Sequence, residues 1–187
     1  TIEFPDELLQ ELETGASVAV NGVCFTVTRI EDRKVSFDAI AETLALSNIQ
    51  FIEEGTQVNI ERSAKSGAEV GGHILSGHIV GTSELLSIEE SSNNKRLTFK
   101  GDPDWLKFVF EKGFLAVNGC SLTVAALDRQ KHQFAINLIP ETLARTNFAL
   151  LKAGDPVNIE IESQTQVIVE TVERIMEQRF PKQSPTA

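Results

Sequence analysis

The sequence predicts an all-β protein made of two tandem homologous β-barrels followed by a C-terminal α-helix. The first observation is a duplication, because three phrases occur twice in the same order. They are "VNGVCFTV" (20–27) and "VNGCSLTV" (117–124), "ETLALSN" (42–48) and "ETLARTN" (141–147), and "VNIE" (58–61 and 157–160). The second is that each copy contains short β-rich runs separated by turn residues, as small closed barrels do. The third is a change to helical apolar spacing after residue 164.

The first repeat opens with a β-rich run, "SVAVNGVCFTVTRI" (17–30), that is broken at Asn21-Gly22. This dipeptide favours a tight hairpin turn because both residues tolerate positive φ. Two further strands are predicted at 34–40 and 56–63, where apolar residues stand near alternate positions. A short helical turn is predicted between them, at 41–49.

The second repeat matches this pattern with strands at 113–127, 132–139 and 155–162 and a helical turn at 140–148. Pro140 suits the first turn of that helix, where its missing N–H is not needed. Two more strands and a loop are predicted at 76–99, before the matching run. Their counterpart in the first repeat would lie about twenty residues before Thr1. We therefore expect a longer native chain, and a first barrel with an open edge.

These observations divide the chain into four parts. They are a first barrel that lacks about twenty N-terminal residues (1–75), a second barrel (76–164), a C-terminal oligomerisation helix (165–180) and a disordered tail (181–187). In the helix, Val169, Val172 and Met176 follow three- and four-residue steps. Such a helix either packs back on its own barrel or forms a seam between copies of the chain, and the pattern leaves both open.

Composition excludes several classes of function. The 187 residues carry a formal net charge of −10 and no basic cluster, which argues against a nucleic-acid surface. No apolar run approaches the roughly twenty residues that a membrane span needs, so no membrane partner is expected. The two cysteines, Cys24 and Cys120, stand at different places in the two repeats. Sparse, unmatched thiols fit a reducing compartment, and we expect a cytoplasmic protein.

A pair of short polar side chains follows the turn in each repeat. In a strand, residues i and i+2 point to the same face, so Cys24 and Thr26 project together, as do Ser121 and Thr123. Their apolar neighbours belong inside a small barrel, which leaves the polar pairs on the outer face. Two interpretations stay open: the pairs bind a planar polar ligand, or they lie on a solvated surface.

The histidines are the other candidate groups, because their pKa lies near neutrality. His73 and His78 lie among four glycines in "EVGGHILSGHIVG" (69–81), whereas His132 stands in a polar loop. The spacing of His73 and His78 and the lack of a cysteine or carboxylate cluster argue against a metal site. The glycines form neither GxGxxG nor a phosphate-binding loop.

Five further residues each have two interpretations, one structural and one functional. Lys112 is either a surface charge or a contact for an anionic or hydroxyl-rich ligand. Glu42 with Thr43, and Glu141 with Thr142, stand at helix starts, where they either cap the helix or face a ligand.

At "NGVCFTV", "NGCSLTV", "GGHILSGHI" and "LIPETLARTN" the chain closely resembles the α-chain type of riboflavin synthase, from Thr1 to about Phe180. The resemblance implies two six-stranded Greek-key barrels and a C-terminal helix that assembles a homotrimer. It implies that two molecules of 6,7-dimethyl-8-ribityllumazine dismutate to riboflavin and 5-amino-6-(D-ribitylamino)uracil, without a metal or redox cofactor. The first barrel of one subunit would face the second barrel of its neighbour. Lumazine synthase is a candidate partner.

The resemblance also implies site residues, position by position. The residues with an expected catalytic role are His78, Ser17, Cys24 and Thr26. The expected substrate contacts are Cys24, Phe25, Thr26, Asp38, Ala39, Ile40, Ala41, Glu42, Thr43, Gly77, His78 and Ile79 in the first half-site, and Lys112, Ser121, Leu122, Thr123, Asn137, Leu138, Ile139, Pro140, Glu141 and Thr142 in the second.

Two alternatives belong to other classes. Lumazine-binding antenna proteins share the duplicated fold but hold one chromophore without turning it over. The presence here of both polar pairs and of "GGHILSGHI" favours the enzyme. A pair of structural barrels without a ligand is the third interpretation, and it predicts no fluorescence change on titration with the lumazine.

Overall fold

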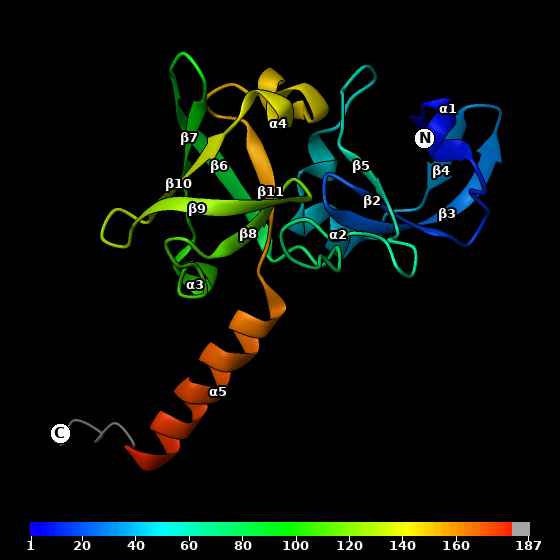
Figure 1. Ribbon diagram of the computed structural model, residues 1–187. Coiled ribbons are helices and arrows are strands. Elements are labelled where there is room, and N and C mark those ends of the chain that lie inside the picture. The colour runs from blue at the N-terminus through cyan, green and yellow to red at the C-terminus, as the bar shows by residue number, and fades with distance from the viewer. Residues whose placement is uncertain (181–187) are drawn as a thin grey trace.

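The structure is a computed structural model, which describes residues 1–180 (Figure 1). The first repeat consists of β1 (Ile2–Glu3), α1 (Asp6–Leu9), β2 (Ser17–Val20), β3 (Val23–Glu31), β4 (Lys34–Phe37), α2 (Ala41–Leu46), the 3₁₀ helix η1 (Asn48–Phe51) and β5 (Ile60–Arg62). A connecting segment, residues 63–80, leads to the second repeat.

The second repeat has the same order of elements with one strand more at its front. It consists of β6 (Gly81–Glu90), β7 (Lys95–Lys100), α3 (Pro103–Leu106), β8 (Phe114–Val117), β9 (Cys120–Asp128), β10 (Gln133–Leu138), α4 (Pro140–Arg145), the 3₁₀ helix η2 (Asn147–Leu150) and β11 (Pro156–Glu160). Its strands close into a barrel in the order β10-β7-β6-β11-β8-β9. The C-terminal helix α5 (Ser163–Arg179) follows.

The Asn-Gly dipeptides form the predicted tight turns. Asn21 and Gly22 have φ values of 46° and 81°, and Asn118 and Gly119 have 46° and 80°. Positive φ at both central residues is the type I′ geometry that matches the twist of two antiparallel strands. The turns therefore join β2 to β3 and β8 to β9, with Val20 opposite Val23 and Val117 opposite Cys120.

The second barrel is filled by apolar side chains from every strand, as predicted. Phe99 and Phe134 stack with 5.3 Å between ring centroids, and Trp105 of α3 meets Phe134 edge-on at 6.0 Å. Such aromatic pairs add to the stabilisation that burial of their area provides. The largest fully buried side chains of this core are Leu85, Leu97, Phe99, Leu115, Phe134, Ile136, Leu138, Phe148 and Ile159.

The first repeat has the open edge that the sequence analysis expected, in place of the complete six-stranded barrel that the resemblance implied. Its strands form an open five-stranded sheet in the order β1-β4-β3-β2-β5. In the second repeat β6 joins β7 to β11, and the counterparts of those two strands are β1 and β5, the edges of the open sheet. A cavity of about 1110 Å³ lies between these edges. Within residues 1–180, the first sheet has no counterpart of β6, so it is open where the expectation placed its open edge.

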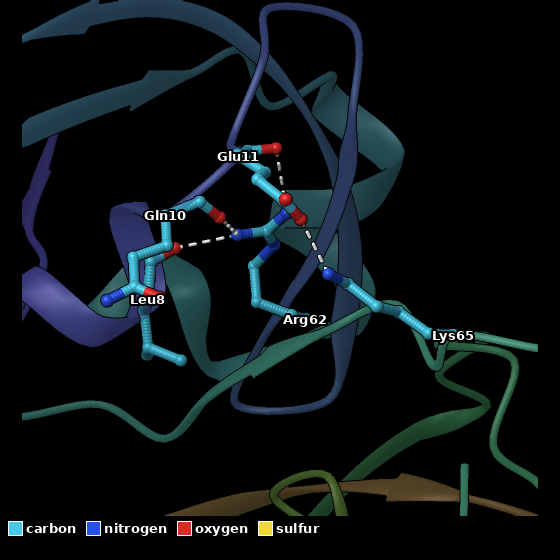
Figure 2. Close-up of polar contacts among 5 residues, drawn as sticks. All are labelled: Leu8, Gln10, Glu11, Arg62 and Lys65. Atoms are coloured by element: carbon cyan, nitrogen blue, oxygen red, sulfur yellow. Dashed lines mark hydrogen bonds and ion pairs between the residues drawn. The ribbon is translucent and has the colours of Figure 1, made fainter.

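Arg62, the last residue of β5, is hydrogen-bonded to the end of α1 and the loop that follows it (Figure 2). Its guanidinium donates hydrogen bonds to the carbonyl oxygens of Leu8 (2.8 Å), Gln10 (3.2 Å) and Glu11 (3.4 Å). The Glu11 carboxylate also pairs with Lys65 at 2.6 Å. A guanidinium suits this role because its donors form a rigid fork that reaches several acceptors. The contacts hold the beginning of the connecting segment on the first repeat.

Six asparagines, three from each repeat, form the seam between the repeats. The backbone N–H of Asn48 donates to Oδ1 of Asn158 (2.6 Å), and the equivalent N–H of Asn147 donates to Oδ1 of Asn59 (2.7 Å). Four of the remaining contacts repeat in the same reciprocal way and include Asn21 and Asn118. Within residues 1–180, the two hydrogen bonds that Oδ1 of Asn48 accepts from Asn21 and Asn158 have no counterpart. Buried amides need such partners, and within residues 1–180 the side-chain atoms of the six asparagines have them except Nδ2 of Asn118 and Oδ1 of Asn147. The seam therefore fixes how the two repeats face each other.

The two Asn-Gly turns also touch directly at this seam. A Cβ on Gly22 would lie 2.6 Å from the backbone nitrogen of Gly119, and a Cβ on Gly119 would lie 2.7 Å from that of Gly22. Such distances exclude a side chain at either position unless the backbone moves. Glycine is therefore required at both turns for two reasons, the positive φ and the close approach.

Helix α5 starts two residues earlier than predicted and runs away from the second barrel (Figure 1). Its N-cap residue, Glu162, accepts hydrogen bonds from the N–H groups of Gln164 and Thr165. Val169 packs on the second core, and Lys107 pairs with Glu173 at 2.7 Å. The predicted disordered tail, 181–187, lies outside the described residues. Among residues 1–180, no helix combines the length and the apolarity that crossing a membrane requires.

Candidate functional site

The two polar pairs occupy equivalent places in the two repeats. Cys24 lies opposite Ala19 in the first hairpin, and Ser121 lies opposite Ala116 in the second. Cys24 and Thr26 are exposed, and Thr123 is exposed with Ser121 half-buried. The apolar residues that alternate with the first pair face inward, since Phe25 is 6% and Val27 1% exposed. In the second strand Val124 is fully buried, but Leu122 is only half-buried. The predicted alternation is therefore confirmed along the first strand and in part along the second.

The connecting segment touches both polar strands through glycines. A Cβ on Gly72 would lie 2.1 Å from Oγ of Ser121, and a Cβ on Gly77 would lie 2.5 Å from Cβ of Cys24. The carbonyl of Gly77 accepts a hydrogen bond from the N–H of Cys24 (3.1 Å). A glycine is thus needed at each contact, and each is followed by a histidine. The "GGHILSGHI" motif places one Gly-His pair on each repeat.

His73 contacts Ser121 directly. Its backbone N–H donates to Oγ of Ser121 (3.0 Å), and its ring Nδ1 lies 2.6 Å from the same oxygen. The ring stacks on Phe114, with 5.3 Å between centroids. Burial lowers the pKa of His73, although the charges of Glu162 and Glu160 act in the opposite direction. A lowered pKa keeps the imidazole neutral at pH 7, the form that accepts a proton.

His78, the histidine that the resemblance favoured, has a different environment. It is exposed, and within residues 1–180 its side chain makes no hydrogen bond. The structure therefore brings His73, rather than His78, to a hydroxyl of a polar pair. The signal in the sequence was the first Gly-His of the same motif, Gly72-His73, whose partner strand only the fold reveals.

A cavity of about 590 Å³ lies between the repeats and the connecting segment. This volume is within the range of small-molecule sites. The residues of interest in its wall come from both repeats and from the connecting segment: Ser17, Cys24, His73, Gly77, Ser121 and Glu160. The cavity thus contains four of the predicted site residues, whereas Thr26 and Thr123 lie farther along their strands, outside its wall.

Two predicted segments, residues 38–43 and 137–142, lie at the ends of the strands β4 and β10. Ile40 and Ile139 precede the short helices α2 and α4 and are exposed by 66% and 59%. Neither helix has a side-chain cap, so Glu42 and Glu141 do not cap their own helix starts. The corresponding segments, 38–43 and 137–142, are exposed except for Thr43, Thr142 and the core residue Leu138. In each repeat this segment therefore exposes both polar and apolar side chains.

The side chains of two predicted contacts belong to the cores instead. Phe25 packs with Val20 and Val23, together with Ile79 from the connecting segment, and Leu138 is buried in the second barrel. Only the backbone of Phe25 and Leu138 is therefore available to a ligand. Lys112 is exposed, with φ at 66°, and its N–H donates to the carbonyl of Val124. Among residues 1–180 there is no group of three side chains arranged for a metal ion.

The two cysteines differ in environment. Burial raises the pKa of the Cys120 thiol to about 12, and the charge of Glu61 acts in the same direction. Because the thiolate is the nucleophilic form, Cys120 is inert at neutral pH. Cys24 is free and exposed, at the edge of the cavity. It is therefore the accessible thiol at the site.

We expect iodoacetamide to modify Cys24 and to leave Cys120 unmodified at pH 7.5, because Cys24 is exposed whereas Cys120 is half-buried and stays protonated. Mass spectrometry of peptides after a short exposure measures both. A saturating ligand in the cavity should slow the modification of Cys24 by about tenfold or more. Equal labelling of the two thiols would contradict this description of the site.

Comparison with known proteins gives one family. The model of the lumazine binding domain matches residues 1–63 and 76–162, one match for each repeat. Riboflavin synthase of Escherichia coli K12 is 48% identical over 179 residues, covering 95% of this chain and 83% of the relative. Riboflavin synthase of Chlamydia pneumoniae is 44% identical over 165 residues, covering 88% and 80%.

Two solved structures of LumP have the same fold as this chain. LumP complexed with 6,7-dimethyl-8-(1'-D-ribityl) lumazine superposes with a TM-score of 0.77 at 26% identity, covering 86% of this chain and 85% of LumP. LumP complexed with riboflavin gives a TM-score of 0.78 at 28% identity, covering 86% of each chain.

Proposed function

The chain belongs to the lumazine binding domain family and, within it, to the riboflavin synthases, and we propose that its two polar strands are the half-sites for two identical substrates. Two molecules of 6,7-dimethyl-8-ribityllumazine react, and a four-carbon unit passes from one to the other. The products are riboflavin and 5-amino-6-(D-ribitylamino)uracil. No metal or redox cofactor takes part in this exchange.

One observation carries the proposal: Cys24 and Ser121 stand at the same register of equivalent hairpins, and each is met by a glycine of the connecting segment. A reaction between two copies of one molecule suits two equivalent sites. Fixing both reactants removes much of the entropic cost of a bimolecular encounter. The exposed segments after β4 and β10 supply the remaining contacts of each half-site.

The chemistry begins with loss of a proton from the acidic C7 methyl group of one lumazine. The resulting carbanion, delocalised into the ring, attacks the C6–C7 imine region of the second lumazine. His73 is the neutral imidazole at the site, and Ser121 connects it to the outer face of the second repeat. We assign proton transfer to this pair. Cys24 and Thr26 orient the ring in the first half-site, with Ser17 beside them.

We also propose that the two half-sites of a working centre come from different subunits of a homotrimer. Support comes from α5, whose side chains Val167, Ile168, Val172, Ile175 and Met176 are 43% to 62% exposed. An apolar face of this kind on a helix that leaves its own barrel suits self-association. Free thiols support a cytoplasmic location, and an association with lumazine synthase is a further prediction.

We expect a Val172→Glu, Met176→Glu double variant to be monomeric and to lose turnover by about 100-fold or more, because charges on the apolar face oppose helix association. Sedimentation velocity measures the mass and absorbance the turnover. The matched control is Glu170→Gln with Glu177→Gln, on the same helix, which should keep the native mass. A wild-type monomer with full activity would contradict the trimer.

Riboflavin formation tests the function itself. The protein is mixed with 6,7-dimethyl-8-ribityllumazine, and the visible absorbance of riboflavin is followed with time. Catalytic formation of riboflavin, with one uracil product for each riboflavin, is the expected result. The LumP structures make a chromophore-binding role the second candidate. Stoichiometric lumazine binding without riboflavin formation would favour that role.

A further inference from the structure

Glu160, the last residue of β11, holds the connecting segment in place. Its carboxylate is enclosed, with 5% of the residue exposed. Oε1 accepts hydrogen bonds from the N–H of Ser76 (2.6 Å) and from its hydroxyl (2.7 Å), and Oε2 accepts one from the N–H of Gly77 (3.1 Å). A buried carboxylate requires donors of this kind, and hydrogen bonds to a charged acceptor are stronger than neutral ones.

Gly77, which donates to Glu160, also contacts the first repeat. Its carbonyl accepts the N–H of Cys24, and its Cα side lies so close to Cys24 that a Cβ would stand 2.5 Å away. A single residue therefore joins the Glu160 carboxylate of the second repeat to the polar strand of the first. Movement of Ser76 and Gly77 would uncover the start of that strand.

The duplication provides an internal comparison. Glu61 is the counterpart of Glu160: it pairs with Ala19 of β2 as Glu160 pairs with Ala116 of β8. Glu61 is exposed, and within residues 1–180 its carboxylate makes no hydrogen bond or ion pair. Burial of part of the side chain and the charge of Glu160 raise the pKa of Glu61. Within residues 1–180, hydrogen-bond donors at this register therefore meet the carboxylate of Glu160 and not that of Glu61.

We propose that Glu160 is a positioning residue of the first half-site, which fixes Ser76 and Gly77 against Cys24 and so presents Gly77, His78 and Ile79 to the ligand. The identity of the ligand as a lumazine rests on the proposed function. The placement of the segment does not, because it follows from the contacts of Glu160 alone. Ile79 adds a second attachment, since it packs on the first core beside Phe25.

The test uses Cys24 as a local reporter. Glu160→Gln keeps the shape of the side chain but removes its charge and sets an NH₂ donor against the donors of Ser76 and Gly77. We expect the N–H of Cys24, which donates to the carbonyl of Gly77, to exchange with deuterium about tenfold faster in this variant, because the segment opens more often. The KM for lumazine should rise about tenfold, with a smaller change in kcat, since ground-state contacts are lost.

Glu61→Gln is the matched control, and it should leave both the exchange rate of the Cys24 N–H and KM within about twofold of wild type. Ser76→Ala removes one donor to Glu160 and should speed this exchange by about threefold, which keeps the test valid if Glu160→Gln fails to fold. Unchanged exchange of the Cys24 N–H in Glu160→Gln and Ser76→Ala would overturn the proposal, as would equal effects in Glu160→Gln and Glu61→Gln. Hydrogen exchange needs no turnover, so it tests the role of Glu160 separately from the formation of riboflavin.

Discussion

His73→Gln is expected to lower kcat for riboflavin formation by about 100-fold, within the range for loss of a general base. The neutral imidazole lies 2.6 Å from Oγ of Ser121, and its lowered pKa keeps it able to accept a proton. Glutamine preserves a polar side chain beside Ser121 but cannot take up a proton. The turnover is followed by absorbance, and lumazine binding by fluorescence titration.

The paired control is His78→Gln, in the same motif and five residues away. Because His78 is exposed and makes no hydrogen bond within residues 1–180, we expect less than about a tenfold loss of kcat. In the wild type, kcat should stay constant as the pH falls through 6.5 and decline only below it, where His73 at last becomes protonated. A larger loss in His78→Gln than in His73→Gln would contradict the assignment.

Local chemistry allowed much of the fold to be predicted. The Asn-Gly dipeptides require positive φ and gave the two hairpins, and the in–out alternation of Phe25 and Val27 against Cys24 and Thr26 followed from strand geometry. The open edge of the first barrel within residues 1–180 was also expected, because closure depends on a strand that pairs with both β1 and β5.

The seam between the repeats was not predicted, although a sequence signal for it exists. Each of the three repeated phrases contains an asparagine, and each of these six side chains belongs to the seam. Their contacts join residues up to 137 positions apart, such as Asn21 and Asn158. Periodicity and turn propensity describe neighbours along the chain, so they do not predict contacts between residues this far apart in the sequence. The duplicated phrases thus reflect the joining of the repeats as well as the half-sites.

Gly119→Ala should destabilise the protein by several kcal/mol. A left-handed φ of 80° costs an L-residue about 1–2 kcal/mol. The new Cβ would also lie 2.7 Å from the backbone nitrogen of Gly22, and overpacking of this kind adds about 1–3 kcal/mol. Urea denaturation measures the free energy of unfolding.

Gly154→Ala separates the two contributions, because Gly154 has a φ of 96° and no atom within 4 Å of its added Cβ. It should lose the conformational part alone, about 1–2 kcal/mol. The difference between the two variants then measures the contact of the turns at the seam. Since Ser121 follows Gly119 by two residues, Gly119→Ala should also weaken lumazine binding, whereas Gly154→Ala should not. Equal destabilisation by both substitutions would show that the close approach of Gly22 and Gly119 contributes nothing to stability.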